Sequence, residues 1–238
     1  MADVMPPSGF EPPQPPTPPE PPFAPPPAPP LLPWEDPAYP RLEALYETAK
    51  LVLFNPREAF SRMSLTVSLG KPILFAVILG WVGIIVGQIY QWAFRSTLAS
   101  LMPGMFARQD MFFSKVASVI TVITAPVWVL FGLGLTTLFI HLFLLLFGGA
   151  QRGFETTLRT LAYSEATYVF QIIPLVGWIV AVIWWFFVSI VGLAQAHGTT
   201  TGRAAGAVLT PVLLCCVCVI AVLVMAGAAI FGALQQLR

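Results

Sequence analysis

The hydrophobic residues of this chain collect into four stretches that contain no Asp, Glu, Lys or Arg: 72–94, 116–151, 166–202 and 204–237. Each exceeds the roughly 20 apolar residues that a helix needs to cross a bilayer. A surface helix of a soluble protein would carry a charged face, and these stretches have no charges to place on one. The pattern therefore predicts a polytopic membrane protein.

The expected fold class is all-α, a helical bundle of five transmembrane helices within residues 72–235. The long second run is interpreted as one tilted helix with Pro126 inside it, because a break at Gly132–Gly134 would leave two pieces too short to cross. The predicted spans are 73–94, 116–147, 154–174, 175–197 and 206–232.

The third of these spans is unusual because it carries charges. Glu155, Arg159 and Glu165 all lie within 154–174. A stripe of small polar side chains follows a period near 3.6 and is expected to pack against other helices. Its members are Thr156, Thr160, Ser164, Thr167 and Gln171.

Two shorter helices are expected before the first span, in a juxtamembrane amphipathic segment over 41–71. Residues 41–54 place apolar side chains at i, i+3 and i+4, and Asn55–Pro56 begins a second helix, with Asn55 as N-cap and Glu58 completing a capping box. Both helices are too short to span, so we expect them on the membrane surface or docked on the bundle.

Residues 1–40 are predicted to be a disordered cytoplasmic tail, because they contain 18 of the 24 prolines. Two interpretations remain open. The PxxP repeats are typical of ligands for SH3- or WW-type grooves, which would give the tail a protein partner. A proline-rich spacer produces the same repeats by chance.

The charges indicate both orientation and partners. A net charge of +1 gives no field that would draw the chain to nucleic acid, so none is expected as a partner. The positive-inside rule places the N-terminus in the cytoplasm, because bases gather on that side of the predicted topology. Five of them form a collar expected to bind anionic lipid headgroups, namely Arg41, Lys50, Arg57, Arg62 and Lys71.

Catalytic and metal-binding patterns are not found in the sequence. There is no phosphate-binding glycine loop, nucleophile elbow or HExxH motif. Cys215, Cys216 and Cys218 lie in an apolar run without zinc-site spacing. We therefore expect no catalytic residues, no metal and no cofactor, and a protein that is not an enzyme.

Three polar residues form a candidate intramembrane site: Glu165, His141 and Arg159. An ionised carboxylate at mid-membrane costs roughly 3 kcal/mol or more, so Glu165 could titrate as a proton or ion site with His141 or Arg159 as partner. The alternative is structural: Glu165 near the interface or neutral in the bundle, His141 bonding between helices, and Arg159 extending to the headgroups.

Several short motifs, in order, resemble the Yip (Ypt-interacting-protein) domain family. They are the entry helix LVLFNPREAFSRM, the tyrosine helix and turn TLRTLAYSEATYVFQIIPLVGWI, and the last-helix entry AHGTTTGRAAGAVLTPVLL. The residues that carry the likeness are Asn55, Pro56, Phe60, Tyr163, Pro174, Gly177, Arg203 and Pro211. The resemblance implies a multipass membrane protein that, in eukaryotes, belongs to the ER–Golgi system and binds Rab-type GTPases.

The resulting hypothesis is a non-enzymatic, membrane-organising or protein-interaction scaffold of the Yip type, embedded in a lipid bilayer. Composition suggests a bacterial member in the inner membrane, and the ER or Golgi is expected for a eukaryotic one. The alternative is a small transporter or channel subunit that uses Glu165 and His141. Gly83-x-x-x-Gly87 is a helix-contact motif that also permits a homo-oligomer.

Overall fold

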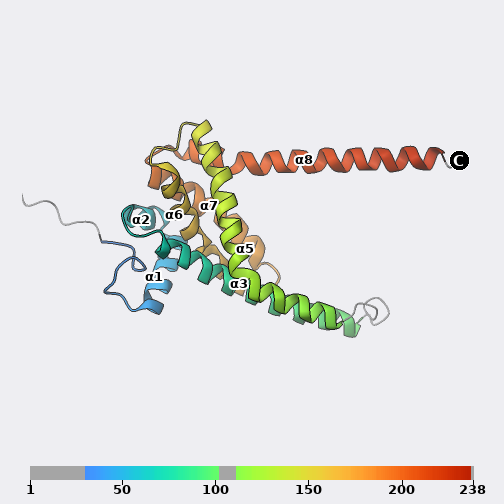
Figure 1. Ribbon diagram of the computed structural model, residues 1–238, viewed down its shortest axis with the longest axis horizontal. Helices are drawn as coiled ribbons and strands as arrows, with labels where there is room; N and C mark the ends of the chain where they lie inside the picture. The colour runs from blue at the N-terminus through green and yellow to red at the C-terminus, as the bar shows by residue number, and fades with distance from the viewer. Residues whose placement is uncertain (1–29, 102–110, 237–238) are drawn as a thin grey trace, which may run out of the picture. The chain divides into compact units, whose positions relative to one another are not determined.

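The computed structural model describes residues 30–101 and 111–236, and this part of the chain forms helices and no strands. The expected all-α class is confirmed. The helices, drawn in Figure 1, are α1 (Arg41–Phe54), α2 (Pro56–Arg62), α3 (Gly70–Leu101), α5 (Met111–Leu146), α6 (Gly153–Ser164), the 3-10 helix η1 (Glu165–Ile172), α7 (Gly177–His197) and α8 (Thr201–Gln236).

Four of the described helices are long and apolar enough to cross a membrane: Gly70–Thr97, Lys115–Leu146, Gly177–His197 and Thr201–Ala228. Their mean hydropathy lies between 2.2 and 3.0. Most of their apolar surface is not covered by the protein itself, as expected if lipid covers it. The prediction of five such helices is corrected to four, because segment 154–174 is not among them.

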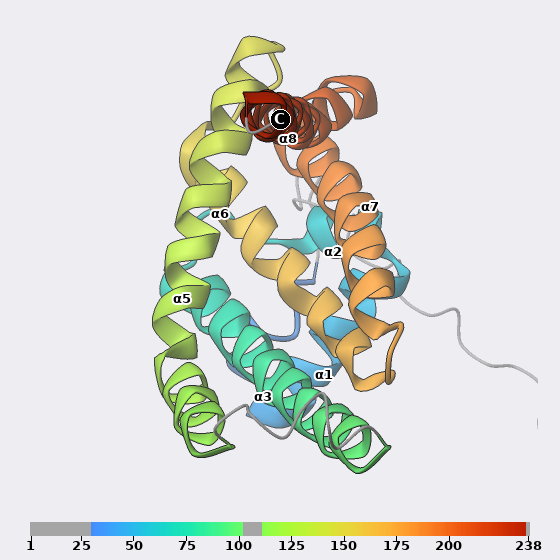
Figure 2. The ribbon, with the colours of Figure 1, turned by 90° about the vertical axis from the view of Figure 1, so that its right-hand side faces the viewer.

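Segment 154–174 is a broken pair of short helices rather than one span. α6 has 12 residues and continues into the eight-residue η1. Hydroxyl groups in α6 bond carbonyls one turn earlier in their own helix, as Thr160 Oγ1 does to Thr156 O at 2.8 Å, and such bonds favour bends. Figure 2 shows the pair running between α5 and α7. The polar stripe is largely buried there, as expected for a helix-packing face.

α1 has the predicted bounds, and α2 begins at Pro56 as predicted. α2 ends already at Arg62, whereas the second helix was expected to continue to Lys71. The capping details differ. Asn55 occupies the N-cap position without a side-chain bond, and Glu58 pairs with Arg62 one turn later instead of returning to the cap. The start of this helix is therefore determined by proline geometry and not by a capping box.

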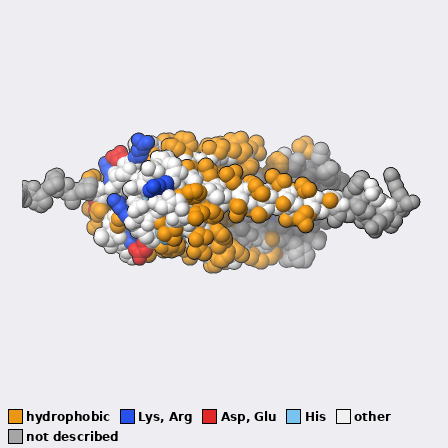
Figure 3. Space-filling model, turned by 90° about the horizontal axis from the view of Figure 1, so that it is seen from above, with side chains coloured by type: hydrophobic (Ala, Val, Ile, Leu, Met, Phe, Trp, Pro, Cys, Tyr) orange, Lys and Arg blue, Asp and Glu red, His pale blue; other side chains and the backbone are white. Residues whose placement is uncertain are grey.

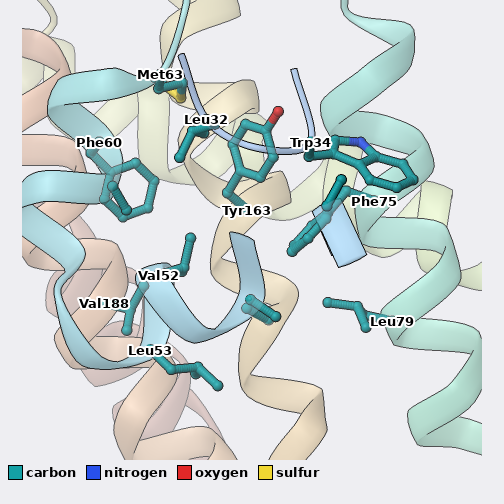
Figure 4. Close-up of a cluster of buried hydrophobic side chains, with 14 of the residues drawn as sticks. Leu32, Trp34, Val52, Leu53, Phe60, Met63, Phe75, Leu79, Tyr163 and Val188 are labelled. Carbon is teal, nitrogen blue, oxygen red and sulfur yellow. The ribbon is translucent and has the colours of Figure 1, made fainter. Parts of the chain in front are cut away.

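Two apolar clusters hold the described helices together. The first joins residues 32–34, α1, α2, α3, α6 and α7, and Figure 4 shows Tyr163 at its centre beside Trp34 and Phe75. The second joins α3, α5, α6, α7 and α8 through residues such as Leu161 and Leu193. α3, α6 and α7 contribute to both clusters, so these three helices connect them.

Glycines on α3 permit close helix contacts within the chain. A Cβ on Gly80 would lie 2.8 Å from Val129 of α5, and one on Gly83 would lie 2.6 Å from the Tyr168 ring of η1. The predicted small-residue stripe therefore serves intramolecular packing. α5 is one continuous helix, as expected, with Pro126 inside it and a change of direction along its length (Figure 1).

The end of the proline-rich segment is packed. Residues 1–29 lie outside the described residues, but Leu32, Trp34 and Glu35 are buried against the bundle. The sequence analysis did not expect this for any part of 1–40.

Charged side chains are concentrated at one end of the face seen in Figure 3, and hydrophobic side chains cover much of the helices beyond it. Two loops are joined by hydrogen bonds. Arg152 Nη1 donates to Ala196 O at 2.9 Å, and Arg203 Nη1 donates to Gly148 O at 3.2 Å. The loop before α6 and the loop before α8 therefore lie side by side.

Candidate functional site

The structure places Glu165, His141 and Arg159 in three different environments and does not bring them together. Arg159 lies beside the packed N-terminal segment, and His141 bonds Thr157 between α5 and α6. Glu165 lines a cavity between α5, η1 and α7.

Arg159 does not extend to the headgroups. It is buried, with Nη1 donating to Ser64 O at 3.4 Å and Nη2 lying 3.7 Å from Glu155 Oε2. A buried guanidinium needs charge compensation as well as hydrogen bonds. Glu35 supplies an acidic neighbour from a segment that sequence analysis had placed in the tail.

Glu35 is the centre of a buried polar network, which we call the Glu35 anchor, formed by Glu35, Tyr163, Ser64, Lys71 and Arg159. Its carboxylate accepts the Tyr163 hydroxyl at 2.9 Å and the Ser64 backbone N–H at 2.8 Å. Lys71 Nζ donates to the Glu35 carbonyl at 2.6 Å. The donors belong to α6, to the loop after α2 and to α3. The segment that contains Glu35 is therefore attached to three parts of the bundle.

Burial raises the pKa of the Glu35 carboxyl above its ordinary value. The hydrogen bonds from Ser64 and Tyr163 and the charges of Arg159 and Lys71 oppose this effect and favour the ionised form. Desolvation is the largest influence. The Glu35 anchor should therefore lose stability as pH rises, whereas a surface salt bridge loses stability as pH falls.

Trp34 holds the same segment through its backbone and its ring. Its N–H donates to Thr48 Oγ1 at 2.9 Å, and its indole N–H donates to the Lys71 carbonyl at 2.7 Å. The ring packs edge-on against Phe75, with centroids 6.0 Å apart. The signal available in the sequence was the apolar cluster LLPW at the end of a segment otherwise poor in large side chains.

A second network joins three helices through one threonine. Thr157 Oγ1 lies 2.8 Å from His141 Nδ1 of α5 and 2.9 Å from His197 Nε2 of α7. The Arg152 backbone N–H donates to His197 Nδ1 at 3.2 Å, which fixes that nitrogen as an acceptor and leaves Nε2–H to donate to Thr157. The Thr157 hydroxyl then accepts from His197 and donates to His141 Nδ1, so all three hydrogen bonds can form at the same time.

The cavity beside Glu165 has a volume of about 360 Å³. Its lining comes from α5, η1 and α7 and includes Trp128, Tyr168, Trp178 and Trp185. Trp185 is also a hydrogen-bonding partner of the Glu165 side chain. Sequence analysis found Glu165 and missed the aromatic walls, because they are contributed by three separate helices.

The predicted headgroup collar divides into two groups. Lys50 pairs with Glu47 at 3.6 Å, Arg62 pairs with Glu58, and Lys71 belongs to the Glu35 anchor. Arg41 and Arg57 are exposed, and no ion pair is found for either within the described residues. Contact of these two bases with lipid headgroups stays a prediction.

Comparison with known families decides the classification. The Yip1 domain model matches residues 50–223. The chain belongs to the Yip1 domain family. The match covers all four candidate membrane helices in large part and excludes the proline-rich segment. It names no organism, so the suggested bacterial origin gains no support. No curated protein and no solved structure matches this chain.

The residues that carry the Yip likeness have identifiable structural roles here. Tyr163 donates to Glu35, and Phe60 fills the space beside Gly192, where a Cβ would lie 2.5 Å from its ring. Gly177 follows Leu175, a residue with φ of 66°, and its own Cβ would lie 2.3 Å from the Phe170 carbonyl. The tight turn after Pro174 therefore requires glycine at 177.

Proposed function

We propose that this Yip1-family protein is a non-enzymatic scaffold that binds protein partners at the cytoplasmic face of its membrane. The bundle anchors it in the bilayer, and α1 presents a binding surface. This surface, which we call the α1 platform, consists of Leu42, Tyr46 and Phe54 with the bases Arg41 and Lys50 of α1 and Arg57 of the adjoining α2.

The exposure of the α1 platform is the observation that carries the proposal. Leu42 is 83% exposed, Tyr46 is 64% exposed and Phe54 is 66% exposed. The side of α1 that packs on the bundle carries Ala44, Thr48, Ala49, Val52 and Leu53, so these larger side chains are left outside. Large apolar side chains beside exposed charges are typical of interaction surfaces.

The platform is rigidly attached to the bundle. The Trp184 indole donates to the Leu53 carbonyl at 2.9 Å, which ties the end of α1 to α7. Val52 and Leu53 are buried beneath it. A preordered surface loses less conformational entropy on binding than a flexible one, so this attachment favours recognition of a partner.

The proline-rich segment offers a second candidate site for protein partners. Residues 1–29 are joined to the Glu35 anchor through residues 30–34, so a partner bound to the tail would be tethered to the bundle. Arg41 and Arg57 support contact with anionic headgroups and a cytoplasmic N-terminus. The membrane is proposed to be the inner membrane in a bacterium and the ER or Golgi in a eukaryote.

Photo-crosslinking in native membranes tests the proposal. A photoreactive residue replaces Tyr46 in one variant and Ile123, which is 69% exposed on α5, in the matched control. We expect protein adducts from position 46 and lipid adducts from position 123. The adducts at 46 should disappear when Leu42→Glu is added and persist with Glu43→Gln.

Lipid-only adducts at both positions would contradict the scaffold proposal. An adduct between two copies of the chain would identify the partner as a homo-oligomer. Deletion of 1–29, which leaves the Glu35 anchor intact, then shows whether the tail contributes. Unchanged partners after this deletion would exclude a binding role for the tail.

The alternative of a transporter or channel subunit rests on Glu165 and His141. The structure separates these residues, because His141 bonds Thr157 whereas Glu165 lines the aromatic cavity. A shared Glu165–His141 pathway therefore has no geometric support among the described residues. Reconstituted vesicles offer the test: a pH-dependent flux that is lost in Glu165→Gln would favour transport over the scaffold.

A further inference from the structure

The cavity between α5, η1 and α7 is large enough to hold a small molecule. Its volume of about 360 Å³ falls in the range of roughly 300–1,000 Å³ typical of ligand pockets. Gly132 contributes to the α5 wall, and a Cβ added there would meet no atom within 4 Å. The space is therefore formed by the absence of a side chain on α5 as well as by the separation of the helices.

Aromatic rings form much of the cavity wall. Trp128 comes from α5, Tyr168 from η1, and Trp178 and Trp185 from α7. The faces of such rings carry negative charge density and attract cations. Rings from three helices line this one space, so a cation inside it would lie near more than one aromatic ring.

Glu165 is the one carboxylate among the residues that line this cavity, and none of them is Lys, Arg or His. The three ion pairs found in the described part of the chain do not include it. A partly buried carboxylate in these largely apolar surroundings is unfavourable without a positive partner. A bound cation would provide the missing charge.

We propose that this cavity is a binding site for an organic cation with a quaternary ammonium group. Glu165 supplies the countercharge, and the Trp and Tyr faces contact the methyl groups. A lipid acyl chain would fill the space but leave Glu165 unpaired. A metal ion would need more ligands, and no group of three His, Cys, Asp or Glu side chains within the described residues could hold one.

Two sources could supply the quaternary ammonium group: a free choline-like cation or the headgroup of a phosphatidylcholine. The chemistry that the cavity recognises is the same in both cases. The site is independent of the α1 platform, so it can be tested without reference to the scaffold proposal.

Equilibrium binding of labelled choline to the purified full-length protein in a non-ionic detergent is the test. We expect saturable binding at one site per chain and at least a tenfold loss of affinity in Glu165→Gln. The matched control is Glu155→Gln, which removes the same charge from an exposed carboxyl at the start of α6 and should bind like the parent protein. Gly132→Leu fills the cavity without altering Glu165 and should also abolish binding, which keeps the test valid if Glu165→Gln fails to fold.

Competition with short-chain lipids distinguishes the two sources. Displacement by phosphatidylcholine but not by phosphatidylglycerol of the same chain length identifies a headgroup site. Displacement by neither identifies a free cation site, and both results support the proposal. Equal displacement by both lipids would overturn it in favour of an acyl-chain pocket. Absence of saturable choline binding, or equal binding by Glu165→Gln, would also overturn it.

Discussion

The hydroxyl of Tyr163 donates a hydrogen bond to Glu35 Oε1 at 2.9 Å, although the two residues lie 128 positions apart in the chain. Both side chains are buried. The bond joins the end of the proline-rich segment to α6, one of the helices that contribute to both apolar clusters. The place where the tail leaves the bundle is thereby fixed relative to the membrane helices.

Tyr163→Phe removes this bond and leaves a buried carboxylate oxygen without its donor. We expect the packing of residues 31–36 to weaken by about 1–3 kcal/mol, because an unsatisfied buried acceptor carries its full desolvation penalty. Limited proteolysis before α1 and hydrogen exchange at Trp34 measure the effect. Tyr46→Phe is the control, since that ring is 64% exposed. Equal protection of the segment in both variants would show that the bond contributes nothing.

The Glu35 anchor should be more stable in mild acid than at neutral pH. Burial raises the pKa of Glu35 in the folded state, so between the ordinary and the raised value the folded chain binds more protons than the unfolded one. Stability from this group is then fully present below the ordinary carboxyl pKa and declines as pH rises through the folded pKa. Hydrogen exchange at Trp34, corrected for intrinsic rates, should show greater protection at about pH 5 than at about pH 8. Glu35→Gln should flatten this dependence, and the opposite slope would be evidence against a desolvated carboxyl.

Gly192→Ala should loosen the contact between α2 and α7. The added methyl would lie 2.5 Å from the Phe60 ring, and overpacking of this kind costs about 1–3 kcal/mol. Gly134→Ala is the matched control, because a Cβ at 134 meets nothing within 4 Å. Thermal unfolding in detergent should show a lower Tm for the first variant and an unchanged or higher Tm for the second. Equal Tm values would mean that the Phe60 ring moves away from the added methyl group without loss of stability.

Thr157→Val should break the network between His141 and His197. The two imidazoles lose a shared hydroxyl partner while the side-chain volume is kept, and each unsatisfied nitrogen costs about 1–3 kcal/mol. Nitrogen NMR of labelled histidine should report the Nε2–H tautomer of His197 in the parent protein and a mixture in the variant. Thr157→Ser should restore the parent spectrum. Thr121→Val, whose hydroxyl bonds Ala117 of its own helix, should leave it unchanged.

The membrane helices could be predicted from the sequence because hydropathy alone marks them. Runs without charge determine α3, α5, α7 and α8, and Pro56 determines the start of α2. The error at 154–174 arose because its apolar content suggests a span, whereas Arg159 and Glu165 lie in surroundings that only the folded bundle supplies. The burial of Arg159 depends on residues from other helices and on the packed N-terminal segment.

The Glu35 anchor and the aromatic cavity could not be predicted for a similar reason. Glu35 lies in a segment whose prolines indicate disorder, and its burial depends on Tyr163, Ser64 and Lys71. The cavity rings come from three helices whose relative rotation is not encoded in local spacing. α1 shows the same limit: its helical period left open whether it lies on the membrane surface or docks on the bundle, and only the folded structure shows Ala44, Thr48 and Val52 buried.

Thiol labelling in sealed membranes is the most direct test that α8 lies in the bilayer and that α1 lies on the cytoplasmic face. Cys215, Cys216 and Cys218 are the native cysteines, and they lie on the exposed surface of α8. A membrane-impermeant maleimide should leave them unmodified until detergent is added, and it should label Tyr46→Cys only when it has access to the cytoplasmic side. Labelling of the native cysteines in intact membranes, or of position 46 from the opposite side, would contradict this arrangement.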